Sequence, residues 1–292
     1  MFGLLNVDKP PGLTSRDVVD HVQRLIRPHK VGHAGTLDPM ATGVLVVCIG
    51  QATRLNQYIQ QLPKTYLATF QLGRSSATED TEGEIVELAA PPRPTPAQVQ
   101  EVLRQFHGRI MQRPPAFSAL KVKGQRAYAR ARRGEPVSLE PRPVHIDRLE
   151  LVDYQYPELV LNITCGSGTY VRSLGRDIAE SLGSAAVMSS LRRTAIGPCS
   201  ADQAIELDEL SLQTIRNKML PAAFAVEHLP RIEVSIEEAL RLGNGQFIEG
   251  TLPADRELAA AVDSAGDLVA LVTPVAQGKL KPHRFFPRST SS

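Results

Sequence analysis

Apolar residues recur at two spacings along the chain, and each spacing predicts a different kind of element. Residues 3–7 form a short apolar run that ends at the turn sequence Asp8-Lys9-Pro10-Pro11-Gly12, which predicts a strand. Thr14 or Ser15 can cap a helix, because apolar residues then recur at helical spacing up to Pro28. Residues 44–49 are continuously apolar and include three valines, which predicts a strand buried on both faces.

The rest of the chain alternates between strand and helix patterns without a regular βαβ rhythm. Thr95 followed by Pro96 is typical of a helix start. We expect further strands at residues 66–72, 144–152 and 159–165, a helix at 170–182, and a weakly helical stretch at 125–133. After Pro230, short apolar runs are separated by glycine turns. These patterns predict an α+β fold with a domain at 1–229 and a small β-rich domain at 230–292.

The composition of the chain is that of a globular protein and not of a membrane or secreted protein. The chain has 292 residues, 42% of them hydrophobic and 22% charged, as in a globular protein. No apolar run approaches the roughly 20 residues of a membrane span, and Asp8 and Lys9 come too early for a signal peptide. We therefore expect a cytoplasmic location.

The three cysteines are far apart, which argues against a disulfide framework or a zinc site and favours buried thiols.

Charge is unevenly distributed although its net value is only +2. Residues 104–148 contain eleven Lys or Arg against three Asp or Glu, whereas residues 79–84 are strongly acidic. A basic segment of this kind suits contact with phosphates, and it equally suits a solvated surface. Charge alone leaves both interpretations open.

The most informative segment is Gly32-His33-Ala34-Gly35-Thr36-Leu37-Asp38-Pro39-Met40-Ala41-Thr42-Gly43, here called the Asp38 signature. Its three glycines allow sharp turns and close approach to a ligand. Pro39 disfavours helical geometry at Asp38. The segment leads into the predicted buried strand, so an acid is held on a stiff loop above a rigid element. Taken alone, Asp38 is also compatible with a turn aspartate, and His33 with a structural histidine.

The Asp38 signature resembles the catalytic motif of the bacterial-type tRNA pseudouridine synthase B family, which modifies the TΨC loop of tRNA. Further segments match the family's other motifs in the same order. They are Asp8-Lys9-Pro10-Pro11-Gly12-Leu13-Thr14-Ser15, Lys64-Thr65-Tyr66, Gly168-Thr169-Tyr170-Val171-Arg172-Ser173-Leu174 and Leu191-Arg192-Arg193. Residues 3–200 carry the resemblance densely. It implies a catalytic domain with a mixed, mainly antiparallel sheet flanked by helices.

The resemblance also implies roles for individual residues. Asp38 is the expected catalytic carboxylate, and Arg172 its ion-pair partner, which we expect to reverse the rise in pKa that burial causes. Tyr66 is expected to stack on the target base, with Tyr170 and Leu191 lining the pocket. His33 is expected to fill the space left by the flipped nucleotide. No metal or cofactor is implied.

RNA contacts outside the pocket are expected in two places. Residues 109–142, here called the insertion, resemble the family's RNA-gripping insertion, with Lys121, Lys123 and Arg126 as candidates for backbone contacts. Residues from about 231 onward resemble a PUA-like RNA-binding domain, weakly marked by Gly245-Gln246-Phe247-Ile248. The expected partner is the T arm of tRNA, with no protein partner and a monomeric chain.

Two other functions remain compatible with parts of the sequence. One is a guide-RNA-dependent synthase that acts on ribosomal RNA, although such enzymes lack the long basic insertion. The other is an RNA-binding or RNA-folding protein without catalysis. The presence of Asp38, Tyr66 and Arg172 together argues against the second alternative.

Overall fold

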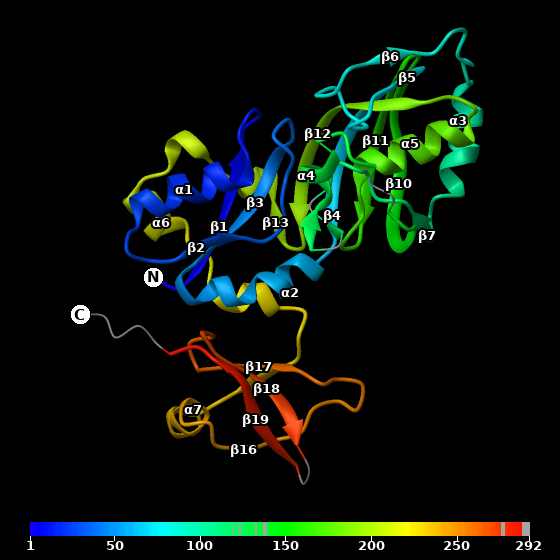
Figure 1. Cartoon of the computed structure of the whole chain (residues 1–292). Helices are drawn as coiled ribbons and strands as arrows, with labels where there is room; N and C mark the ends of the chain where they lie inside the picture. The colour runs from blue at the N-terminus through cyan, green and yellow to red at the C-terminus, as the bar shows by residue number, and fades with distance from the viewer. Residues whose placement is uncertain (119, 123, 132, 137–138, 276–277, 288–292) are drawn as a thin grey trace.

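The computed structural model contains a large sheet with helices on its two faces and, below it, a smaller sheet formed by the C-terminal residues (Figure 1). It describes residues 1–118, 120–122, 124–131, 133–136, 139–275 and 278–287. Among these residues, no helix is both long and apolar enough to cross a membrane.

The large sheet has ten strands within the described residues, in the order β14-β1-β3-β12-β4-β11-β10-β7, with β13 beside β12 and β2 beside β3. The strands are β1 (Gly3–Lys9), β2 (Val31–His33), β3 (Thr42–Ile49), β4 (Lys64–Leu72), β7 (Gly108–Gln112), β10 (Arg142–Gln155), β11 (Glu158–Cys165), β12 (Ala186–Ile196), β13 (Cys199–Ser200) and β14 (Ile205–Glu206). Only the pairs β1–β14 and β3–β12 are parallel. The mixed, mainly antiparallel sheet that we expected is confirmed.

Seven α-helices occur in the described part of the chain: α1 (Ser15–Leu25), α2 (Asn56–Gln61), α3 (Pro96–Arg104), α4 (Ala127–Ala131), α5 (Val171–Ser181), α6 (Leu212–Lys218) and α7 (Ile236–Gly243). Thr14 caps α1 and Thr95 caps α3, and each cap forms a reciprocal capping box with the third helical residue. The two predicted helix starts are therefore confirmed.

Strand β3 is covered on both faces, as its apolar run predicts. Leu45 and Val47 pack with Val18 and Val22 of α1 on one face. Val44, Val46 and Cys48 pack on the other face with residues of α2 and of the C-terminal sheet. Figure 1 shows α1 and α6 beside this half of the sheet, and α3 and α5 beside the other half. All three cysteines are buried, in agreement with the sequence.

The C-terminal sheet has the order β15-β17-β18-β19-β16. Its strands are β15 (Arg231–Glu233), β16 (Ile248–Glu249), β17 (Ala259–Val262), β18 (Leu268–Val275) and β19 (Lys279–Phe285). This small sheet agrees with the expected β-rich C-terminal unit, while the domain boundary near residue 230 stays a prediction. Helix α7 was not predicted there.

Two further differences concern the catalytic part. Strand β12 was not predicted, although it lies in the centre of the large sheet between β3 and β4. The predicted helix at 125–133 is wrong at its start, because residues 125–126 form a hairpin strand and the helix observed among the described residues of this stretch is Ala127–Ala131. The short pairs in this part are β5 (Arg74–Ser75) with β6 (Val86–Glu87), and β8 (Lys121–Val122) with β9 (Gln125–Arg126).

Candidate active site

Asp38 lies in the loop of residues 34–41, which joins β2 to β3 and is here called the Asp38 loop. The residues on either side of the acid are fixed by the N-terminal motif. The buried Lys9 Nζ donates hydrogen bonds to the carbonyl oxygens of Pro10 (2.8 Å), Leu13 (2.7 Å) and Pro39 (3.1 Å). Ser15 Oγ accepts a hydrogen bond from Leu37 N (2.9 Å) and donates one to Leu37 O (3.2 Å). The backbone that presents Asp38 is thus held from both sides.

The Asp38 carboxylate pairs with Arg172, near the start of α5. Arg172 Nε lies 3.1 Å from Asp38 Oδ2, with the Arg172 side chain 7% exposed and that of Asp38 34% exposed. Arg172 Nη1 also lies 3.2 Å from Asp80 Oδ2 and donates to Thr78 O at 2.7 Å. Its Nη2 donates to Phe117 O in the insertion at 3.1 Å. Every nitrogen of the guanidinium therefore has a partner, and two carboxylates share its charge.

Because Asp38 and Asp80 share the charge of Arg172, the pKa of Asp38 depends on both of these neighbours. Burial raises the pKa of Asp38, the charge of Arg172 opposes the rise, and the nearby Asp80 carboxylate adds to it, so the pKa remains above its ordinary value. The expectation that Arg172 reverses the effect of burial is wrong. Arg172 limits the rise, because part of its charge is already balanced by the buried Asp80.

Tyr66 and Leu191 lie beside the loop on the paired strands β4 and β12. Leu191 is opposite Ala68, and Tyr66 is opposite Arg193. Both predicted pocket residues are buried and belong to one apolar cluster with Leu37. Burial raises the pKa of Tyr66, so its hydroxyl stays protonated at neutral pH. The structure thus brings Asp38, Tyr66, Arg172 and Leu191 together, and their roles stay predictions.

His33 and Tyr170 lie at the borders of this group. His33 ends β2, and burial lowers its pKa, which favours the neutral imidazole. Tyr170 precedes α5, and its backbone N–H donates to Gln112 Oε1 (2.9 Å) while Gln112 Nε2 donates to Tyr170 O (3.1 Å). The guanidinium of Arg142 lies 5.4 Å from the centre of the Tyr170 ring. An uncharged ring and a fixed tyrosine are both suited to contact with a base.

The three candidate phosphate contacts lie in the insertion. Lys121 and Arg126 are opposite each other in the hairpin of β8 and β9, whereas Lys123 lies outside the described residues. Nearby, Arg130 and Arg133 both pair with Glu135, at 2.8 and 2.7 Å. Part of the positive charge of the insertion is therefore neutralised within the insertion itself.

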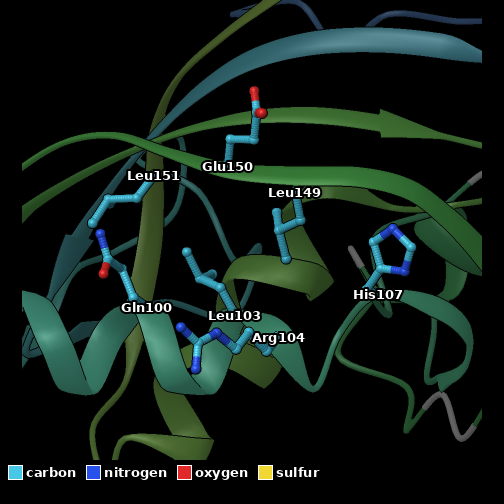
Figure 2. Close-up of a pocket in the computed structure, with 7 residues that line it drawn as sticks. All are labelled: Gln100, Leu103, Arg104, His107, Leu149, Glu150 and Leu151. Carbon is cyan, nitrogen blue, oxygen red and sulfur yellow. The ribbon is translucent and has the colours of Figure 1, made fainter.

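Two cavities of about 540 Å³ each occur in the described part of the molecule, and Asp38 lines neither of them. One lies between α3 and β10 and is lined by leucines with Gln100, Arg104, His107 and Glu150 around them (Figure 2). It contains none of the predicted site residues. The other adjoins Lys9 and Arg192. The candidate site is therefore defined by the convergence of Asp38, Arg172 and Tyr66.

Comparison with protein families identifies both halves of the chain. The model for the N-terminal domain of TruB family pseudouridylate synthases matches residues 23–171. The model for the C-terminal domain of tRNA pseudouridylate synthase B matches residues 172–240. The chain belongs to the TruB family of pseudouridylate synthases.

Curated relatives within the TruB family match almost the whole chain. The tRNA pseudouridine synthase B of Arthrobacter sp. (strain FB24) is 43% identical over 99% of this chain and 98% of its own length. The enzyme of the same name from Corynebacterium diphtheriae is 41% identical over 95% of this chain and 93% of its own length. The family resemblance in the sequence is thereby confirmed.

Solved structures support the same fold. The Cbf5 chain of a Cbf5-Nop10-Gar1 complex has a TM-score of 0.74 and 28% identity, with 95% of this chain and 79% of that chain covered. A chain of an archaeal box H/ACA sRNP Nop10-Cbf5 complex has a TM-score of 0.75 and 25% identity, over 98% of this chain and 87% of that chain. The α+β fold that we expected is the fold of these TruB-like proteins.

The sequence analysis assigned no role to Lys9, Ser15 or Asp80, which contact the Asp38 loop or Arg172 in this TruB family member. Lys9 and Ser15 belong to a motif that we matched without assigning roles within it. Asp80 belongs to the acidic run 79–84, which we read only as a region of negative charge. The run lies in the segment that follows the predicted strand at 66–72, but the contact of Asp80 with Arg172 depends on tertiary structure.

Proposed function

We propose that the chain converts a uridine in the TΨC loop of tRNA to pseudouridine, with Asp38 as the catalytic carboxylate. The observation that carries this proposal is the Asp38–Arg172 ion pair at 3.1 Å, formed within two motifs of the family and next to Tyr66. An acid that is half covered, paired and fixed at both neighbours is preorganised for one reaction.

The reaction breaks the N1–C1′ bond of uridine and forms a C5–C1′ bond after the base has rotated. C5 loses a proton and N1 gains one, so the atoms balance and no electrons are exchanged with a cofactor. The uridine must first leave its stack, which costs a few kcal/mol. Tyr66, Tyr170 and Leu191 offer surfaces for the extruded base, and the neutral His33 takes its place in the loop. Asp38 acts as the charged group because Arg172 favours its ionised form.

The proposal includes a monomer that acts in the cytoplasm and grips the T arm through the insertion. A guide-RNA-dependent activity is less well supported, since the named tRNA enzymes are 41–43% identical to this chain while the Cbf5 structures are 25–28% identical. A binding protein without catalysis has no need of a half-buried carboxylate whose pKa is raised.

The test is to incubate unmodified tRNA transcripts with the protein and to map pseudouridine at each position. The unchanged protein should modify one uridine of the TΨC loop. Asp38→Asn should form no pseudouridine while its affinity for tRNA stays within about tenfold, or about 1.4 kcal/mol. Asp20→Asn is the matched control, because Asp20 is an exposed acid that pairs with Arg16 on α1. Substantial turnover by Asp38→Asn would contradict the assignment.

A further inference from the structure

Arg193 in β12 is a buried arginine whose side chain is directed into the Asp38 loop. The residue is 2% exposed. Its Nε donates to Val44 O at 2.7 Å, Nη2 to Gly35 O at 3.1 Å, and Nη1 to Thr36 O at 3.4 Å. One guanidinium therefore joins the beginning of the loop to the strand that follows the loop.

Arg193 is held without a carboxylate partner among the described residues, in contrast to its neighbour. Arg192 is 40% exposed and pairs with Asp8 at 2.6 Å. Burial of an arginine with only carbonyl partners is costly, so a core position of this kind is better filled by an apolar residue unless the guanidinium fixes a geometry. The planar fork has that ability, because it directs its N–H groups to several acceptors at once.

The glycines of the Asp38 signature fit this arrangement. A Cβ at Gly43 would lie 2.2 Å from the backbone oxygen of Arg193. Gly35, whose carbonyl accepts from Arg193, has a φ of +103°, which disfavours any residue with a side chain. Gly35 in the loop and Gly43 at the start of β3 are thus both required where these segments pack on Arg193.

Arg193 also contacts the second predicted catalytic residue. Tyr66 is its partner across the β4–β12 pair. Residues opposite each other in an antiparallel pair direct their side chains to the same face of the sheet, so the guanidinium lies beside the Tyr66 side chain. Arg193 therefore packs against both the Asp38 loop and Tyr66.

We infer that Arg193 is a positioning residue that holds the Asp38 loop and Tyr66 in one fixed arrangement for the reaction. The inference rests on the proposed function. It goes beyond that function because Arg193 is given no contact with the substrate and acts only through the two residues that it holds.

The test measures the single-turnover rate at saturating enzyme and, separately, the affinity for tRNA. Arg193→Met should lower the rate by about a hundredfold or more, because a displacement of about 1 Å at a reacting group has an effect of this size. The affinity of Arg193→Met for tRNA should stay within about threefold of that of the unchanged protein. Arg193→Lys should recover part of the rate, since one ammonium cannot reach all of these acceptors. Gly43→Ala should also lower the rate, because its new methyl group meets the backbone of Arg193 and displaces β3 from β12 while the guanidinium is intact.

Ile215→Ala is the control for lost stability. Ile215 belongs to α6 and is fully buried in a cluster with Leu5 and Val7 of β1, so truncating it destabilises the fold without touching the loop. The rate of Ile215→Ala should therefore stay near that of the unchanged protein. If Arg193→Met does not fold, Arg193→Lys and Gly43→Ala decide the question. The inference is overturned if Arg193→Lys and Gly43→Ala both keep the full single-turnover rate. It is also overturned if the rate of Ile215→Ala falls as far as that of the Arg193 variants. Activity of Asp38→Asn would instead remove the proposed function itself.

Discussion

At the scale of single residues, the site depends on how α5 holds the segment that follows β4. Arg172 reaches Thr78 O and Asp80, and Ser173 Oγ donates to Glu79 Oε2 at 2.7 Å. Arg176 pairs with Glu79 as well. Glu79 has a φ of +62°, a strained conformation for a residue other than glycine, and these contacts maintain it. Asp80 is therefore fixed beside Arg172 before any RNA binds.

The two partners of Arg172 predict opposite shifts in the pH dependence of the reaction. Asp38 must be ionised to react, so the rate falls as pH decreases through its pKa. Asp80→Asn removes a negative charge that raises this pKa, and the acidic limb should move to lower pH. Arg172→Lys weakens the opposing positive contact, and the limb should move to higher pH. Single-turnover rates across the acidic range measure both shifts.

Arg148→Lys is a suitable control for these two variants, because Arg148 is 62% exposed and pairs only with Glu150 among the described residues. Its profile should match that of the unchanged protein. Shifts of the same sign in Asp80→Asn and Arg172→Lys would contradict the view that both carboxylates compete for one guanidinium.

At the scale of elements, local signals predicted the long strands β1, β3, β4, β10 and β11 and the helices α1, α3 and α5. Thr14 and Thr95 mark the starts of α1 and α3 through their side-chain caps, and the apolar run of β3 shows its double burial. Strand β12 was missed because it contains Ser189-Ser190 and Arg192-Arg193, which interrupt the apolar pattern. The burial of Arg193 depends on carbonyl groups of residues 35, 36 and 44, and no local pattern reveals them.

The insertion gives a prediction at the same scale. Replacing Lys121, Lys123 and Arg126 with Ala should weaken binding of tRNA and flatten the slope of log affinity against log salt by about two to three units, because each phosphate contact contributes roughly 0.7 to 0.9. The same loss is expected for unrelated stem-loops, since phosphates carry no sequence information. Binding titrations at several salt concentrations measure the slope.

A matched control removes charge from the same insertion. Arg130 and Arg133 already pair with Glu135, so replacing both with Ala should change the slope by less than about one unit. If the triple variant keeps the original affinity and slope, its three residues form a solvated surface and the insertion does not bind phosphates through them.

At the scale of the whole molecule, the C-terminal sheet is joined to the catalytic part through a shared apolar core. Phe286 is buried and stacks on Phe2, with ring centres 5.5 Å apart. Arg54 covers the Phe286 ring and donates to Phe285 O at 3.0 Å. Residues of β1, β3, α2, β17 and β18 belong to the same cluster. The two sheets are therefore expected to unfold together.

Removal of the Phe286 ring should test this connection. Phe286→Ala should lower the free energy of unfolding by about 3 to 5 kcal/mol and should separate one cooperative transition into two, because the shared core is disrupted. Calorimetry and urea unfolding measure both effects. Phe247→Ala, at a residue 47% exposed in the same C-terminal unit, should change stability by about 0.5 kcal/mol or less. A single transition of unchanged midpoint in Phe286→Ala would contradict the expectation.

The position of β12 has a consequence for synthesis of the protein on the ribosome. Strands β3 and β4 are neighbours in the chain, yet β12, which begins only at Ala186, lies between them. The growing polypeptide therefore carries two incompletely paired strands until this distant segment emerges, and such non-local pairing is slow. Arg193 arrives with the same segment. Products of interrupted translation that end before β12 consequently lack the contacts of Arg193 with the Asp38 loop, and we expect RNA modification to begin only when most of the polypeptide has been made.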